Sequence, residues 1–323
     1  MTARKQSKVN TKYKTKYRVR NWAEYEKGLR QRGNITFWFN EEALNQWNAK
    51  KLGKPGGQAK YSDLAIVTTL TLRALFRLPL RQTEGLVSSL VNLMGLHLEI
   101  PDHTTLSRRS GKVDVVHSKV NHDQPIHLMV DSTGLKIVGE GEWHSHKHKT
   151  SNRNRKWRKL HLGIDSQGYI VTSKLTTSNH SDVFAIPSLL EKLKTPIAEF
   201  TSDGGYDSQG VYQGLEKVGT TDIKIVIPPR QTAIPNPSAS GAYQQRNLVV
   251  ERIKEVGLNK WKKEVGANKQ ARVENAIGRV KKITGNQLSS RKFANQEKEV
   301  EIKINLLNRM TDLGKPESYK VMD

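Results

Sequence analysis

The spacing of apolar residues changes along the chain, and the change separates two kinds of structure. Between residues 61 and 120, apolar positions recur every three or four residues, which is the period of a helix packed on one face. Pro79 and Pro101 divide this stretch into three predicted helices, and Ser62 can cap the first of them. From residue 124 the period becomes two, which predicts strands.

The second region alternates predicted strands with predicted helices. Strands are expected over 126–131, 160–164, 169–176, 198–202 and 223–227, and helices over 183–193 and 208–218. A proline-rich loop over 228–245 follows, and a helical pattern then runs with breaks from about 246 to 310. Three consecutive strands followed by alternating helices and strands predict an α/β fold, a mixed sheet flanked by helices.

Three carboxylates interrupt these patterns at nearly equal intervals. Asp131 closes the first predicted strand, and Asp203 directly follows the fourth. Glu274 lies in a predicted helix whose apolar stripe, which includes Val273 and Ile277, can dock on the sheet. Such carboxylates can converge on two divalent ions, which together activate the attacking oxygen and stabilise the leaving oxygen of a phosphodiester. They are therefore candidate catalytic residues and candidate ligands of two Mg²⁺ or Mn²⁺ ions.

Charge restricts the partners that this chain can have. There are 54 Lys and Arg residues against 31 Asp and Glu, a formal net charge of +23, and mean hydropathy is −0.66. This excess predicts a polyanionic partner, for which nucleic acid is the usual choice, and it disfavours a glycosidase, which could also use paired carboxylates. The absence of cysteine excludes disulfides and thiolate metal sites. No apolar run predicts a membrane span or a signal peptide, so a cytoplasmic, nucleoid-associated protein is expected.

Basic residues gather in three segments that are candidates for contact with DNA. Residues 1–20 hold eight Lys or Arg and no acid, as either a phosphate-binding arm or a solvated tail. The third helix of the 61–120 region is polar, which fits a helix-turn-helix or an ordinary helical bundle. Residues 143–164 carry no acid and form either a DNA clamp or a solvated hairpin. The candidates in the last two segments are Arg108, Arg109, Arg155, Trp157, Arg158 and Lys159.

Several motifs occur in a characteristic order. They are Asp131-Ser-Thr-Gly-Leu-Lys136, Gly139-Glu-Gly-Glu-Trp143, Trp157-Arg-Lys-Leu-His161, Asp203-Gly-Gly-Tyr-Asp207, Ile227-Pro-Pro-Arg230, and Glu274 with Arg279-Val-Lys281. Together they resemble bacterial insertion-sequence DDE transposases of the IS-five family, over roughly residues 60–310. The resemblance implies an RNase H-like fold in which Asp131, Asp203 and Glu274 match the metal-binding triad. It also implies that Arg279 and Lys281 bind phosphate.

The resemblance implies a DNA transposase whose segments have separate functions. A basic arm over 1–20 would precede a helical DNA-binding region over 21–120, which would bind the terminal inverted repeats. A catalytic domain over 121–312, followed by a tail over 313–323, would hydrolyse a phosphodiester at the element end. The released 3′-hydroxyl would then attack target DNA. Double-stranded DNA would be the partner, no membrane would be involved, and synapsis of two ends would require at least a dimer.

Two departures from the family pattern leave other functions open. The family often carries a Tyr-Arg-Glu-Lys signature around the glutamate, and here Ala267 and Gln270 stand where Tyr and Arg are expected. One alternative is a DNA-binding repressor or titrator descended from such an enzyme. Another is a two-metal nuclease of the same fold, which would cut nucleic acid without joining it to new DNA.

Overall fold

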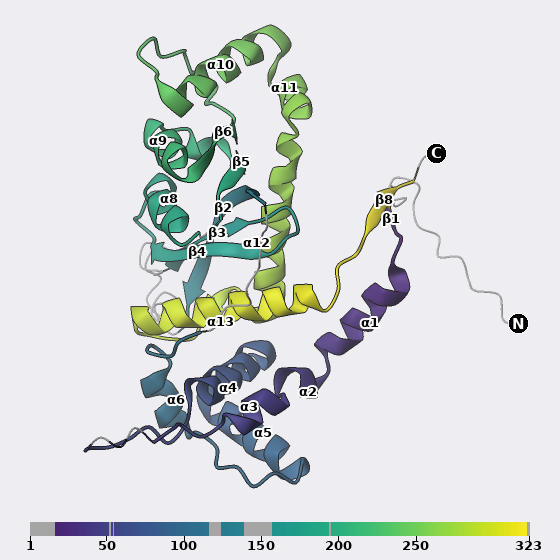
Figure 1. Cartoon of the computed structure of the whole chain (residues 1–323), viewed down its shortest axis with the longest axis vertical. Coiled ribbons are helices and arrows are strands. Elements are labelled where there is room, and N and C mark those ends of the chain that lie inside the picture. Colours follow the sequence, from purple (N-terminus) through teal and green to yellow (C-terminus); the bar gives the residue numbers. More distant parts are fainter. Residues whose placement is uncertain are drawn as a thin grey trace, which may run out of the picture.

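The molecule consists of two bodies that lie end to end (Figure 1). The computed structural model describes residues 17–51, 53, 55–115, 124–138, 157–193 and 195–321. Helices from the first third of the chain form one body, and a sheet flanked by helices forms the other. The long helix α13 (Phe293–Asp312) lies between the two.

The N-terminal body contains the three predicted helices and other helices before them. Its elements are α1 (Trp22–Arg32), α2 (Ile35–Trp38), α3 (Glu41–Asn45), α4 (Asp63–Phe76), α5 (Leu80–Leu93) and α6 (His103–Arg109). The Ser62 hydroxyl accepts the Ala65 N–H at 3.0 Å, so the predicted cap of α4 is confirmed. Asp102 caps α6 in the same way, by accepting the N–H groups of Thr104 and Thr105.

The second body is built on a mixed sheet, as predicted. Its strands are β2 (Ile126–Ile137), β3 (Trp157–Ile164), β4 (Ile170–Thr177), β5 (Ile197–Thr201), β6 (Gly219–Val226) and the short β7 (Gln287–Leu288). The order is β4-β3-β2-β5-β6, with antiparallel pairs on one side of β2 and parallel pairs on the other. Three consecutive antiparallel strands, continued on the other side of the first by two parallel ones, form an RNase H-like arrangement.

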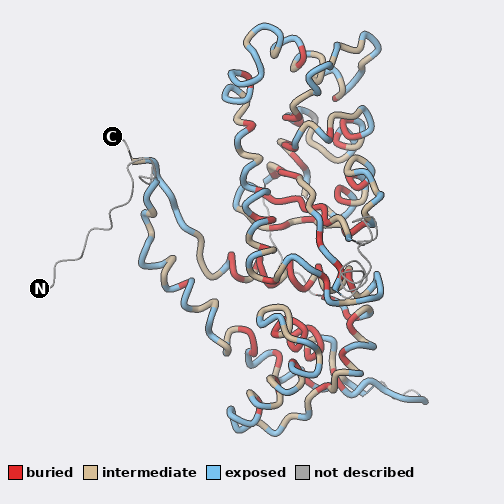
Figure 2. Tube along the Cα trace, turned by 180° about the vertical axis from the view of Figure 1, so that it is seen from behind, coloured by how far each residue is buried: buried red, intermediate tan, exposed pale blue. Residues whose placement is uncertain are grey.

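Helices cover both faces of this sheet. The side chains of Leu128 and Val130 pack beneath α8 (Asp182–Glu191) and α9 (Gln209–Val218). On the other face, Met129 and Leu162 pack beneath α12 (Ala271–Thr284) and α13. Within this body, Figure 2 shows buried residues in the strands of the sheet and in the helices that flank it. This alternation of faces along β2 follows the period-two pattern of its sequence.

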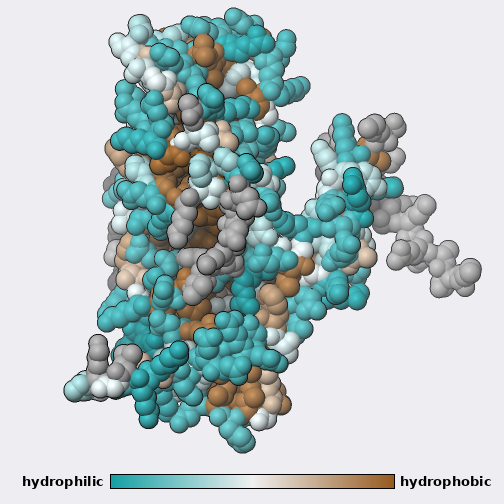
Figure 3. Space-filling model, in the orientation of Figure 1, coloured by the Kyte–Doolittle hydropathy of each residue, from teal (hydrophilic) through white to brown (hydrophobic). Residues whose placement is uncertain are grey.

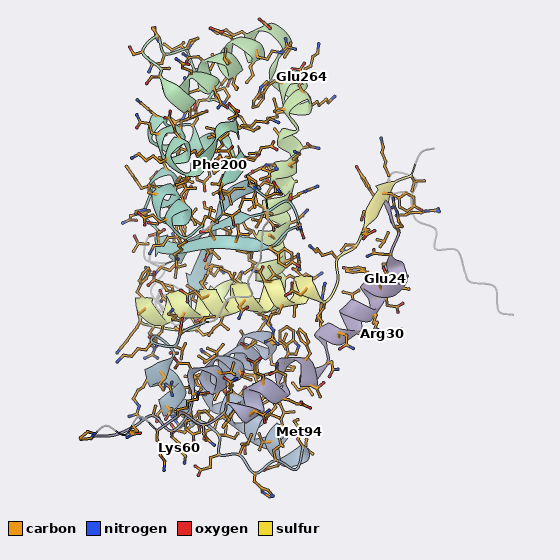
Figure 4. All side chains as sticks on the ribbon, viewed as in Figure 1. Glu24, Arg30, Lys60, Met94, Phe200 and Glu264 are labelled. Carbon is orange, nitrogen blue, oxygen red and sulfur yellow. The ribbon has the colours of Figure 1, made fainter. Side chains whose placement is uncertain are left out.

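Two parts of the chain extend away from these bodies. The helices α10 (Gln244–Val256) and α11 (Leu258–Val265) form a hairpin at the end of the sheet body far from the N-terminal helices (Figure 1). On another side, β1 (Tyr17–Val19) pairs with β8 (Ser318–Lys320), and α1 joins this small sheet to the N-terminal body. Glu24 and Arg30 lie on that projecting helix (Figure 4). Short 3-10 helices occur at Gly204–Tyr206 (η3), Gly241–Tyr243 (η4) and Ala267–Gln270 (η5).

One face of the molecule is predominantly polar. Hydrophilic residues cover most of the face shown in Figure 3, including the end that carries the α10–α11 hairpin. In the part of the chain that the structure describes, no helix has the length and apolar character needed to cross a membrane.

Candidate active site

The register of the parallel strands brings two of the three carboxylates to the same level. Met129 of β2 lies opposite Thr201 of β5. Asp131 and Asp203 each follow that pair by two residues, so both lie where the parallel pairing of β2 with β5 ends. Carboxyl ends of adjacent parallel strands form the usual ligand-binding edge of an α/β sheet.

The expectation that Asp131 closes its strand was wrong. Strand β2 continues through Asp131 to Ile137, because its second half pairs with β3 and its last two residues pair with β7. Only the parallel partner β5 stops before this point. Asp131 is consequently held by an antiparallel neighbour, Leu162, while its other flank opens beyond the end of β5. A backbone fixed on one side and open on the other can present a carboxylate in a defined position.

Asp131 is half-buried and lies close to other negative charges. Its Oδ1 accepts the N–H of Ser132 at 2.7 Å. Burial raises the pKa of Asp131 from 3.8 to about 6; the Ser132 hydrogen bond opposes the shift, and the charges of Asp203 and Glu274 add to it. Asp131 therefore lies close enough to Asp203 and Glu274 for the charge of each to act on it.

Asp203 and Glu274 are exposed and line one groove of about 750 Å³. Asp203 precedes η3, and its Oδ1 accepts the Gly205 N–H at 2.9 Å, which fixes the carboxylate. Glu274 lies in the first turn of α12, next to the fully buried Val273 that packs this helix on the sheet. Each carboxylate is thus positioned by its own local structure.

The groove has two walls that come from different parts of the chain. One wall is made by the ends of β5 and β6 and the other by the segment from α11 to α12. The lining residues are Ser202, Asp203, Gly204 and Pro228 on the first wall, and Lys262, Lys263, Ala267, Asn268, Gln270, Ala271 and Glu274 on the second. At Gly204, a Cβ atom would lie 2.9 Å from the Pro228 carbonyl oxygen, so a side chain there would collide with backbone. Glycine after Asp203 therefore allows the two strand ends to approach closely.

Polar contacts dock the second wall onto the sheet. The Gln270 side-chain amide donates to the Val130 carbonyl at 2.9 Å, one residue before Asp131. Lys269 lies 3.4 Å from Glu199 of β5, and Glu199 also pairs with Lys224 of β6 at 3.2 Å. These contacts fix η5 relative to β2 and β5, and hence fix the start of α12 relative to both aspartates.

Two family models match this chain, and both are described as a transposase DDE domain. One covers residues 122–309 and the other covers residues 30–140. The chain belongs to the DDE transposase family. It is therefore a transposase that acts in DNA transposition through a DDE-type nuclease activity. The narrower IS-five membership remains a prediction.

The transposase is also similar to a solved structure from another transposase. A cryo-EM structure of the piggyBac transposase synaptic complex with hairpin DNA matches at 9% sequence identity and a TM-score of 0.38. The match covers 85% of this chain and 73% of that one.

DDE transposase domains typically use divalent metal ions, and the donor atoms of this transposase suit such ions. Carboxylate oxygens are the ligands that Mg²⁺ and Mn²⁺ prefer. A bound cation would offset the charges of Asp203 and Glu274, which add to the rise that burial causes in the pKa of Asp131. Within the described ranges, no three His, Asp or Glu side chains lie close enough together to hold one ion. The carboxylate oxygens thus suit a divalent metal by their chemistry. Asp203 and Glu274 line a shared groove, but the three acids do not form one compact ligand cluster.

Several cations expected to bind DNA have partners within the protein. Lys159 pairs with Asp182 at 3.1 Å, and Arg158 donates to Gln296 at 2.9 Å. Arg279 donates to Thr311 at 3.0 Å, and burial lowers its pKa. Arg109 donates to Asp63 and to the Tyr61 carbonyl. Their guanidinium and ammonium groups therefore form hydrogen bonds or ion pairs within the protein.

The other expected DNA ligands lie in less enclosed places. Arg108 is exposed on α6, and Trp157 begins β3 with 37% of its surface exposed. Lys281 is half-buried on α12, two helical turns after Glu274. Arg155, with most of the basic loop and most of the basic arm, lies outside the described residues.

Sequence reasoning missed two features of the groove. The first is the role of Gln270, which it treated only as a departure from the family pattern. The second is the pair Lys262 and Lys263, which lines the groove beside the acids. A usable signal was present, because Trp261 and Val265 are spaced as the apolar stripe of a helix and the lysines directly follow the tryptophan.

Proposed function

We propose that this transposase cleaves DNA at the ends of an insertion sequence and joins the released ends to new DNA, with Asp131, Asp203 and Glu274 as its catalytic, metal-binding residues. The observation that carries the proposal is the Met129–Thr201 register. It puts both aspartates at one edge of the sheet. Asp203 and Glu274 line one groove there, and the charges of both act on Asp131.

Each carboxylate would act from a fixed position. The Ser132 N–H holds Asp131, the Gly205 N–H holds Asp203, and the packing of Val273 holds Glu274. When bound by these residues, two Mg²⁺ or Mn²⁺ ions supply activation of the attacking oxygen and stabilisation of the leaving one. Preorganised ligands need no rearrangement when substrate arrives, which lowers the cost of reaching the transition state.

The proposed substrate is double-stranded DNA, first the terminal inverted repeats and then the target. The net charge of +23 supports a nucleic-acid partner. We propose that the helical region over 21–120 binds the repeats, with Arg108 exposed on α6, and that residues 121–312 form the catalytic domain. Joining two ends requires a dimer or larger assembly on DNA, and a location at the nucleoid follows from this partner.

The decisive experiment measures 3′-end cleavage and joining of labelled duplexes that carry the sequences flanking this gene. Wild type, Asp131→Asn and the matched control Asp222→Asn, an exposed acid outside the groove, are compared with and without Mg²⁺ or Mn²⁺. We expect metal-dependent cleavage and joining in wild type and control, with a loss of at least about 10³-fold in Asp131→Asn, the scale of a lost catalytic group.

The other outcomes of this experiment point to different functions. Metal-dependent cuts that never join to a plasmid would identify a nuclease. Tight, sequence-specific binding without cleavage by any of the three proteins would identify a DNA-binding repressor. Equal activity of wild type and Asp131→Asn would overturn the assignment of the carboxylate.

A further inference from the structure

Two lysines share the groove with two of the three proposed catalytic acids. Lys262 and Lys263 lie on α11 and line the same groove as Asp203 and Glu274. They are the only cations among the described residues that line it. Neither belongs to the motifs that carry the family resemblance.

The fold holds these lysines in a fixed relation to Glu274. Trp261, which is 2% exposed, packs against Val226 at the end of β6 and against Ala267 of η5. Gly266, with φ of 71°, ends α11 in the left-handed region and turns the chain directly into η5. The lysines are therefore connected to α12 through a short, anchored turn, and not through a free loop.

The acid on the same helix is already paired. Glu264 lies on α11 (Figure 4), where it contacts Arg252 of α10 at 3.0 Å. In contrast, Lys262 and Lys263 are exposed, and within the described part of the chain neither forms an ion pair. Their ammonium groups are thus available to an anion that enters the groove.

The charges of the groove limit what can occupy it. Before metal binds, Asp203 and Glu274 would repel a phosphodiester, and cations near them would offset part of that repulsion. Ala267 and Gln270 also line this wall, at the positions where the family pattern has Tyr and Arg, and neither is charged. Lysine contacts to phosphate position a nucleic acid without reading its sequence.

We propose that Lys262 and Lys263 bind the backbone phosphates next to the scissile phosphate and so position the DNA strand over the carboxylates. The inference rests on the proposed function, because it takes the groove as the place of cleavage. Lys262 and Lys263 are positioning residues here, and the chemistry belongs to the acids.

The first test measures binding, which does not depend on cleavage. The salt dependence of affinity for a labelled duplex carrying the gene's flanking sequence is measured in metal-free buffer. Wild type is compared with Lys262→Gln/Lys263→Gln and with the control Lys254→Gln/Lys260→Gln, which removes the same charge from exposed positions of the same hairpin outside the groove. Each lost phosphate contact reduces the slope of log K against log salt by about 0.9, so the groove variant should lose about 2 and the control should lose none.

The second test locates the contact on the DNA. Once the cut is mapped, a neutral methylphosphonate replaces each neighbouring phosphate in turn. In wild type, neutralising the contacted phosphate should lower kcat/KM about tenfold, the effect of losing about 1.4 kcal/mol. In the Lys262→Gln/Lys263→Gln variant the same replacement should have no further effect, because the two changes remove one interaction. The Lys262→Arg/Lys263→Arg variant should restore sensitivity.

The two tests separate failure of the inference from failure of the proposed function. If wild type cleaves DNA and the groove and control variants have equal salt slopes, the lysine assignment is overturned while the function stands. If wild type never cleaves but the groove variant alone loses slope, the phosphate site stands and the enzymatic proposal falls. Additive effects of methylphosphonate and lysine replacement would also overturn the assignment.

Discussion

At the scale of single residues, Asp131 reduces the stability of the folded protein. Burial and the neighbouring acids raise its pKa from 3.8 to about 6, so the folded state disfavours the charged form that exists at neutral pH. We expect Asp131→Asn to raise the free energy of unfolding by about 1 kcal/mol at pH 7, discounted for partial exposure, while it abolishes cleavage.

The pH dependence of this stability gain tests the prediction. A raised carboxyl pKa costs stability above about pH 6, and the cost disappears as pH falls below 3.8. Urea denaturation at pH 7 and at pH 4 should therefore show an advantage of Asp131→Asn that shrinks in acid. Asp222→Asn serves as the control, and an advantage of equal size in that variant would show that net charge, not the site, is responsible.

His161 is a second residue whose titration affects folding. It is fully buried on the α8 face, with Nε2 2.9 Å from the Thr176 hydroxyl and Nδ1 3.6 Å from Asp182. Burial lowers its pKa from 6.5 to about 4. A depressed histidine pKa contributes stability above pH 6.5, and this is lost as pH falls towards 4, because the unfolded chain takes up the proton first.

The loss attributed to His161 should be measurable by urea denaturation. Between pH 7 and pH 5 the wild type should lose about 2 kcal/mol through this residue. His161→Gln should lack that part of the pH dependence, and His97→Gln, which alters an exposed histidine, should keep it. Identical pH profiles in all three proteins would contradict the assignment.

The sequence predicted part of the site. The alternation along 126–131 correctly put Asp131 on the face opposite Leu128 and Val130. The continuation of β2 beyond Asp131 was not predictable, because it depends on pairing with the distant strands β3 and β7. The role of Gln270 was also hidden, since its acceptor is the carbonyl of a residue that is 140 positions away.

At the scale of elements, an ion pair anchors the start of α10. Arg246 donates to Asp207 at 2.8 Å, and the Asp207 side chain is only 1% exposed. Asp207 follows η3, so the pair ties the α10–α11 hairpin to the loop that carries Asp203. This ion pair gives Asp207, the last residue of the Asp203-Gly-Gly-Tyr-Asp207 motif, a structural role.

Breaking this pair should be costly. Arg246→Ala would leave the Asp207 carboxylate buried without its partner, and we expect a loss of about 3 kcal/mol in the free energy of unfolding. The double variant Arg246→Met/Asp207→Asn should recover much of that loss, because no uncompensated charge remains. Urea denaturation of Arg246→Met, Asp207→Asn and the double variant closes a double-mutant cycle that measures the coupling. A double variant as unstable as Arg246→Ala would argue against the buried-charge explanation.

The hydrophobic period predicted most elements but not how the last third of the chain divides. It indicated one helical stretch with breaks from about 246, whereas the structure has α10, α11, η5, α12, β7 and α13. The breaks after α10 and α12 occur at Gly257 and Gly285, both with φ near 80°. Glycine permits this backbone, but a glycine in the sequence does not reveal whether its φ is positive.

At the scale of the whole molecule, α13 joins the two bodies. Its Ile302, Leu306 and Met310 belong to the apolar core of the N-terminal helices. The alternate residues Ile304 and Leu307 belong to the core beneath the sheet. A helix that is apolar on two sides cannot leave either body without exposing a core. The two bodies on either side of residue 120 therefore depend on each other for stability.

This shared helix predicts that the two bodies unfold together. Leu306, fully buried against the N-terminal helices, should cost about 2–5 kcal/mol when replaced by Ala. Native-state hydrogen exchange should then accelerate to a similar degree at the most protected amides of α4 and of β3, although Leu306 belongs to the N-terminal core alone. Leu93→Ala, at a site 84% exposed, is the matched control and should change neither. Faster exchange confined to α4 would mean that the helical body opens by itself, as an independent DNA-binding domain would.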